Sequence, residues 1–186
     1  MLGFVILRVS GVPEANWISD LSVALVSKWE RGLRRLERVP AVTIAVADGD
    51  CGGPALDALL VADYRIMPAG ARLVMPVVTG ATWPGMALYR LARQAAGAAL
   101  ARRAVLFGMP IGAAEAQAMG VIDDVAGNAA LALEKAMEVA GAASGTELAI
   151  RRQLMLEAMT TTFEDALGVH LAACDRALRS VAAGAA

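Results

Sequence analysis

A glycine-rich segment between a strand pattern and a helix pattern is the part of the sequence best suited to chemistry. Residues 41–46 have the pattern of a buried strand, Gly49-Asp-Cys-Gly-Gly53 follows, and Pro54 suits the first position of a helix. Such a segment aims backbone N–H groups and a helix dipole at one place, where they could bind a phosphate or an oxyanion. The glycines also have a purely steric explanation, because strand-to-helix connections often need small residues. The spacing matches neither a P-loop nor a Gly-x-Gly-x-x-Gly turn.

Few other side chains are suited to metal binding or nucleophilic catalysis. The sequence has one histidine, His170, and two cysteines, Cys51 and Cys174. We therefore expect no metal site, no disulfide framework and a reducing, cytoplasmic setting. Cys51 has no histidine close in sequence, which favours a buried structural role over a nucleophile. His170 falls on the apolar side of a predicted helix, which favours packing in the core or a subunit contact.

Composition indicates one globular domain. The 186 residues include 17 Lys and Arg and 18 Asp and Glu, a formal net charge of −1. This balance argues against a nucleic-acid partner. The longest stretch without charge, residues 73–89, contains Pro76, Gly80, Pro84 and Gly85, so we expect no membrane span. Residues 1–8 lack the basic start of a secretory signal.

Strand and helix patterns alternate in the first two thirds of the sequence, which predicts the α/β class. Apolar runs predict buried strands at 4–9 and 41–46 and short strands at 63–66 and 72–75. Apolar residues three or four apart predict a helix that starts at Ser19 and ends before Pro40. Residues 48–53 predict a tight turn, and a helix should then run to about residue 62.

Helix patterns dominate the remainder of the chain. We expect a long helix over residues 86–106, weakened near Gly97, a short helix over 113–119 and a brief strand over 121–125. Three more helices should start near Asn128, after Thr146 and after Thr162. The prediction is one domain, with an α/β core over residues 1–125 and a helical region over 126–186 for packing or oligomerisation.

Several segments, in their order along the chain, resemble a known family. They are Pro40-Ala-Val-Thr-Ile-Ala-Val-Ala-Asp-Gly49, Gly52-Gly53, Asp63-Tyr-Arg-Ile66, Pro84-Gly85 and Ala113-Ala-Glu-Ala-Gln-Ala-Met-Gly-Val-Ile-Asp123. Together they resemble the crotonase superfamily, which contains the enoyl-CoA hydratases and isomerases. The resemblance implies a crotonase-like ββα spiral (superhelix) followed by C-terminal helices. It also implies an acyl-CoA substrate without a further cofactor, and a homotrimer or hexamer.

The resemblance further implies an oxyanion hole, formed by two backbone N–H groups that stabilise a thioester enolate. It places one donor at Ser19, with Ile18 beside the substrate. An ungapped alignment puts Pro54 at the second donor position, and proline has no N–H group. Either Gly53 donates instead, with Gly52 beside the substrate, or the hole is incomplete; we favour Gly53.

Hydratases of this family use two glutamates, and the resemblance places Asp57 at the first position and Val77 at the second. Asp57 is then the candidate general acid or base, although an acid in the first turn of a helix can also be a surface residue. The absence of a carboxylate at Val77 argues against ordinary water addition by two glutamates. It leaves room for an isomerisation or dehydration that needs one acid.

The segment around Pro84 is the candidate wall of the acyl pocket, where Thr82, Trp83 and Gly85 would contact the substrate. For Trp83 and Tyr89, packing in the core or a role in the turn is favoured over contact with the substrate. Arginine pairs such as Arg151 and Arg152 are expected on solvated faces, and one pair could meet the phosphates of coenzyme A.

A narrower resemblance concerns actinobacterial members of this family. It is carried by residues 28–31, 49–53, 81–86 and 170–175. Those members act in the biosynthesis of 3,5-dihydroxyphenylglycine for glycopeptide antibiotics, in which a type III polyketide synthase works towards 3,5-dihydroxyphenylacetyl-CoA. The resemblance implies an enzyme that assists dehydration of the polyketide, or a non-catalytic accessory partner of the synthase. A serine hydrolase is disfavoured because no serine lies between Ser27 and Ser144.

Overall fold

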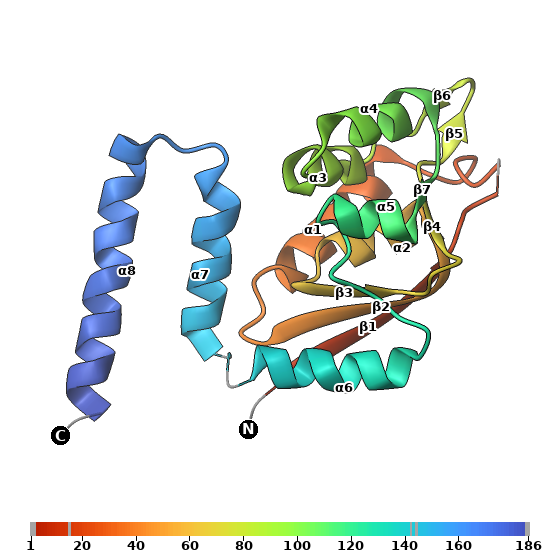
Figure 1. The fold of residues 1–186 in the computed structure, drawn as a ribbon. Coiled ribbons are helices and arrows are strands. Elements are labelled where there is room, and N and C mark those ends of the chain that lie inside the picture. The colour runs from red at the N-terminus through yellow and green to blue at the C-terminus, as the bar shows by residue number, and fades with distance from the viewer. Residues whose placement is uncertain (1–2, 15, 142, 144, 185–186) are drawn as a thin grey trace.

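The chain folds around one mixed sheet, as the α/β prediction requires (Figure 1). The computed structural model describes residues 3–14, 16–141, 143 and 145–184. The strands of the main sheet are β1 (Phe4–Gly11), β2 (Val42–Gly52), β3 (Tyr64–Met67), β4 (Arg72–Val74), β7 (Ile111–Gly112) and β8 (Asp124–Val125). A separate hairpin consists of β5 (Val77–Val78) and β6 (Ala81–Thr82).

Strand β2 is the centre of the sheet. Its residues 42–47 pair in parallel with β1 on one edge, and residues 44–46 pair with β3 on the other. The end of β2 pairs instead with β4, through Cys51 with Leu73 and Gly52 with Val74. The tight turn expected at residues 48–53 is therefore wrong, because these residues find a partner strand that is distant in sequence.

Alternate residues of β2 face two different helices, as the period of a strand requires. Val42, Ile44 and Val46 pack in one cluster with α6 (Ala129–Ala140). Ala45 and Ala47 belong to the other cluster, which includes α2 (Pro54–Leu60). The sheet is thus covered on both faces, and α6 lies along it although the sequence placed that helix in the C-terminal region (Figure 1).

The helices before α6 follow the predicted positions with two shifts. Helix α1 (Val23–Leu36) begins at Ser22, whose hydroxyl accepts a hydrogen bond from the Leu25 N–H at 3.2 Å, and not at Ser19. Glycine at position 97, with φ of 127°, divides the long predicted helix into α3 (Met86–Gln94) and α4 (Ala98–Phe107). Helix α5 (Ala113–Ala118) follows.

Two further helices form a hairpin that stands beside the core (Figure 1). They are α7 (Gly145–Ala158) and α8 (Phe163–Gly184), and α8 packs against α7. The Asp165 N–H donates to the Thr162 hydroxyl at 3.2 Å, which confirms the predicted cap of α8. The apolar stripe of α8, with Phe163, Leu167 and Leu178, is exposed. No helix in the described ranges is long and apolar enough to cross a membrane.

Candidate active site

All three tryptophans of the sequence line one cavity. Trp17 comes from the loop between β1 and α1, Trp29 from α1, and Trp83 from the segment before α3. The rings of Trp17 and Trp83 meet edge to face, with centroids 5.3 Å apart. The cavity has a volume of about 290 Å³, and its other lining residues are Leu21, Leu25, Val26, Glu30, Pro54, Asp57, Gly85 and Met86. An apolar wall with a few polar groups is typical of a small-molecule site.

Asp57 is the acidic group of this cavity that is not held in an ion pair. It lies in the first turn of α2, where its N–H donates to the Gly53 carbonyl at 2.9 Å. Its Oδ2 accepts a hydrogen bond from the Trp29 Nε1–H at 3.2 Å. Burial raises the pKa of the Asp57 carboxyl, and the charge of Glu30 adds to that rise. The Trp29 hydrogen bond, the charge of Arg90 and the backbone N–H of Ala87 oppose the rise without cancelling it. Asp57 therefore keeps its proton to higher pH than an exposed aspartate, which suits a general acid.

Two residues of the cavity carry buried polar atoms without a hydrogen-bond partner. They are the Oδ1 atom of Asp57 and the Nε1 atom of Trp17, and neither finds a partner within the described part of the chain. A buried polar atom that lacks a partner costs about 1–3 kcal/mol. Such atoms are rare in folded proteins, so each needs an explanation.

Glu30 is the second carboxylate of the cavity, but its oxygens are already engaged. Arg90, a buried residue of α3, donates to Glu30 Oε1 at 2.8 Å and to Glu30 Oε2 at 3.2 Å. Arg34 donates to Glu30 Oε1 at 3.0 Å, and Arg90 also contacts Glu37 at 3.3 Å. These bonds occupy both carboxylate oxygens of Glu30 and tie α1 to α3.

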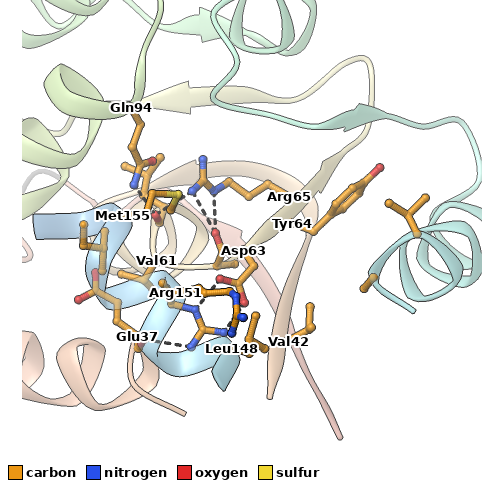
Figure 2. A pocket seen from close by; sticks show the side chains of 16 residues that line it. Glu37, Val42, Val61, Asp63, Tyr64, Arg65, Gln94, Leu148, Arg151 and Met155 are labelled. Atoms are coloured by element: carbon orange, nitrogen blue, oxygen red, sulfur yellow. Dashed lines mark hydrogen bonds and ion pairs between the residues drawn. The ribbon is translucent and has the colours of Figure 1, made fainter. Parts of the chain in front are cut away.

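A larger cavity of about 420 Å³ lies between α7 and the core, and Asp63, Arg65 and Gln94 are among its walls (Figure 2). The charged groups Asp63 and Arg152 of this cavity bond to each other and stabilise the fold. Arg152 is buried and donates to both carboxylate oxygens of Asp63 at 2.6 Å. It also donates to three backbone carbonyls, those of Glu37, Val39 and Ala41. The expectation that Arg152 is solvated is therefore wrong, whereas Arg151 is exposed as expected.

Comparison with known proteins identifies the family. The sequence matches the family model described as enoyl-CoA hydratase/isomerase over residues 21–184. It is also 56% identical over 177 residues to a protein of Amycolatopsis orientalis described as an enoyl-CoA-hydratase. That alignment covers 95% of this chain and 81% of the relative. The chain belongs to the enoyl-CoA hydratase/isomerase family.

Solved structures of other family members confirm the crotonase fold. An enoyl-CoA hydratase from Thermoplasma volcanium superposes with a TM-score of 0.77 at 18% identity, over 95% of this chain and 74% of that one. An enoyl-CoA hydratase/isomerase from Marinobacter aquaeolei gives 0.70 at 21% identity, over 94% of this chain. This chain spans 64% of the length of the Marinobacter structure. At these identities the likeness concerns the fold.

The structure brings together three of the site residues that the family resemblance suggested in the sequence. Asp57, Trp83 and Gly85 all line the three-tryptophan cavity. A Cβ atom at Gly85 would lie 2.9 Å from the Trp83 ring, so glycine is what lets the indole lie against the backbone. Tyr89, by contrast, is 56% exposed and lies outside the lining of this cavity.

The other suggested contacts lie outside that lining. The Thr82 hydroxyl donates to the Val105 carbonyl, and Gly52 pairs with Val74 in the sheet. Ile18 is half-buried and Pro84 is exposed. Their contact with a substrate stays a prediction.

The two suggested oxyanion donors differ in their present hydrogen bonds. The Ser19 N–H donates to the Asn16 carbonyl at 3.0 Å within a turn, so a thioester oxygen would have to replace that carbonyl. Gly53 caps the start of α2 with φ of 52°, directly before Pro54, which lines the cavity. A Cβ atom there would lie 2.9 Å from Pro13. Both donor roles stay predictions, and Gly53 is the better placed of the two.

Sequence reasoning missed Trp17, Trp29 and Glu30 as site residues. Val77, at the position of the family's second glutamate, is half-exposed in β5 and does not line the cavity. The second carboxylate of the cavity comes from α1 instead. The one feature of the sequence that could have pointed to Trp17 and Trp29 is the rarity of tryptophan, which occurs three times in 186 residues. The spacing of Trp29 fitted the apolar stripe of its helix and gave no reason to look further.

The cysteines and the histidine do not form a second site. Cys51 is buried as expected, and burial raises the pKa of its thiol to about 11, so it stays protonated at neutral pH. His170 is exposed on α8, which contradicts packing in the core of this chain, and its Nε2 lies 3.7 Å from the Cys174 sulfur. Among the residues with a described structure, no three His, Cys, Asp or Glu side chains gather as metal ligands would.

Proposed function

We propose that this chain acts on an acyl group carried on coenzyme A as a thioester. In this proposal it assists the dehydration and aromatisation of a cyclised polyketide intermediate to 3,5-dihydroxyphenylacetyl-CoA. The observation that carries the proposal is Asp57, a half-buried residue with a raised carboxyl pKa and one unpartnered oxygen, which lines a tryptophan-lined cavity. The 56% identity to a protein described as an enoyl-CoA-hydratase supports thioester chemistry.

One carboxyl is sufficient for the proposed step. Protonated Asp57 gives its proton to the departing hydroxyl, the carbon–oxygen bond breaks, and water leaves. The adjacent carbon–hydrogen bond then supplies its electron pair to the new double bond, and its proton returns to the Asp57 carboxylate. Formation of an aromatic ring favours this loss of water. The Gly53 N–H would donate a hydrogen bond to the thioester oxygen, which makes the carbon–hydrogen bond beside that carbonyl easier to break.

The wider setting is also a proposal. It follows from the narrower resemblance and places the chain beside a type III polyketide synthase, in the cytoplasmic biosynthesis of dihydroxyphenylglycine for a glycopeptide antibiotic.

The first test is Asp57→Asn in an assay reconstituted with the synthase, in which formation of 3,5-dihydroxyphenylacetyl-CoA is followed. Asparagine keeps the size of the side chain and removes the acid, so we expect the rate to fall by about 10²–10⁴-fold. Asp175→Asn, on an exposed face of α8, is the matched control and should leave the rate unchanged. An unchanged yield with Asp57→Asn would remove Asp57 from the mechanism.

A second candidate is a non-catalytic partner that holds the synthase product. The engagement of Glu30 by two arginines and of the Ser19 N–H by Asn16 favours it. Incubation of the chain alone with a free CoA thioester of the intermediate separates the two candidates. Turnover supports the enzyme, and binding without turnover supports the accessory role.

A further inference from the structure

The three-tryptophan cavity has features that a simple apolar acyl chain does not use. The indole rings of Trp17, Trp29 and Trp83 surround it, and flat aromatic walls favour a flat ligand. Trp17 and Asp57 belong to its walls, and their Nε1 and Oδ1 atoms are buried without a hydrogen-bond partner in the described part of the chain. The remaining polar groups are occupied: Trp29 Nε1 is bonded to Asp57, and Glu30 to Arg90 and Arg34.

The chemistry of the two unpartnered atoms limits which groups of a ligand could bond to them. An indole N–H can only donate a hydrogen bond, so its partner must be an oxygen or another acceptor. The Asp57 carboxyl donates when it is protonated and accepts when it is ionised, so it suits a hydroxyl or a carbonyl oxygen. A hydrocarbon ligand would leave both atoms unsatisfied, and a site built to bond a polar substituent rejects analogues that lack it.

We propose that the cavity binds a planar ring that carries hydroxyl or carbonyl oxygen, and that Trp17 selects such rings by donating its Nε1–H to a ring oxygen. This inference rests on the proposed function only in that the ring would arrive as a CoA thioester. It makes Trp17 a specificity-determining residue, whereas Asp57 carries the proton. The contact of Trp17 with Trp83, at 71° between ring planes, holds the donor in place.

The test follows the indole N–H signals of the chain by proton–nitrogen NMR, since each of the three tryptophans gives one signal. The probes are 3,5-dihydroxyphenylacetyl-CoA and phenylacetyl-CoA, together with resorcinol and toluene as rings without coenzyme A. We expect the oxygenated rings to move the Trp17 indole signal downfield and the apolar rings not to do so. We expect 3,5-dihydroxyphenylacetyl-CoA to bind about three- to tenfold more tightly than phenylacetyl-CoA.

Trp17→Phe keeps an aromatic ring and removes the donor. It should bring the ratio of the two thioester affinities close to one while phenylacetyl-CoA binds nearly as before. Leu21→Ala is the matched control, because it alters an apolar part of the wall and should leave the ratio as in the wild type. An unchanged ratio in Trp17→Phe, or a Trp17 signal that does not move at saturation, overturns the inference and leaves the proposed function standing. Binding of resorcinol without binding of either thioester would support the inference and contradict the proposed function. Binding of none of the probes would contradict both.

Discussion

At the scale of single residues, burial and the hydrogen bond from Trp29 are the two largest influences on the pKa of Asp57, and they act in opposite directions. Burial disfavours its charged form and raises the pKa of the carboxyl, while the hydrogen bond from Trp29 favours the charged form. Trp29 is thus a positioning residue in the proposed reaction. Its hydrogen bond fixes Oδ2, so Oδ1 is the oxygen that the proposal assigns to the substrate.

Trp29→Phe should separate this role from packing, because phenylalanine keeps an aromatic wall but donates no hydrogen bond. Without that bond the pKa of Asp57 rises further. If Asp57 acts as an acid, the rate falls as pH rises through this pKa, so the descending limb of the pH profile should move to higher pH. The measurement is the pH dependence of the rate in the wild type and in Trp29→Phe. A limb that moves to lower pH, or does not move, would contradict the role.

Leu25→Ala provides the control, since it removes an apolar wall of the same cavity and touches no hydrogen bond of Asp57. It should change substrate affinity and leave the pH limb in place.

The site could be predicted from the sequence only in part. Asp57, Trp83 and Gly85, which line the cavity, could be suggested because local motifs of a known family contain their positions. Trp17 and Trp29 were not found, because they meet Trp83 only after the loop before α1, the helix itself and the segment before α3 come together. The spacing of residues 17, 29 and 83 along the chain does not indicate that their side chains line one cavity.

At the scale of elements, Arg152 is the main polar attachment of α7 to the core. Its guanidinium bonds Asp63 and three carbonyls from the segment between α1 and β2. Arg152→Met should lower the free energy of unfolding by about 3 kcal/mol, because it leaves Asp63 and these carbonyls without their donor. Arg151→Met is the control, since Arg151 makes an exposed pair with Glu147 worth about 0.5 kcal/mol or less.

Unfolding by urea, monitored by circular dichroism, measures both effects. Equal stabilities of the two variants would show that α7 is held by apolar packing alone. Proteolysis supplies a second measurement, since loss of the Arg152 hydrogen bonds should make α7 easier to cleave in Arg152→Met than in Arg151→Met.

The elements also show where local sequence patterns stop being informative. Periodicity predicted α1, α2 and the strands near β1 and β3 because those patterns depend on neighbours in the chain. It failed at residues 48–52, where pairing with β4 extends β2, and at Arg152, whose partners lie about 90–115 positions away. Arg151 and Arg152 are adjacent and chemically identical, so only the tertiary structure shows that Arg152 bonds to the core and that Arg151 is exposed.

At the scale of the whole molecule, α8 is the element with least support from the rest of the chain. It packs against α7, and both stand beside the core (Figure 1). Leu167, Leu171 and Leu178 are 55%, 55% and 71% exposed along one helix. A continuous apolar surface of this kind is typical of an interaction site. The resemblance to crotonases assigns it to contacts between copies of the chain.

Light scattering in solution tests that assignment. We expect a mass of three or six times 19.2 kDa, and a return to the single-chain mass when Leu167, Leu171 and Leu178 are all replaced by serine. The core should remain folded in that variant, because none of the three leucines belongs to either buried cluster. Leu131→Ser, at an equally exposed position of α6, should leave the assembly intact. A wild-type mass of 19.2 kDa at micromolar concentration would mean that the α8 surface is not an interface between copies.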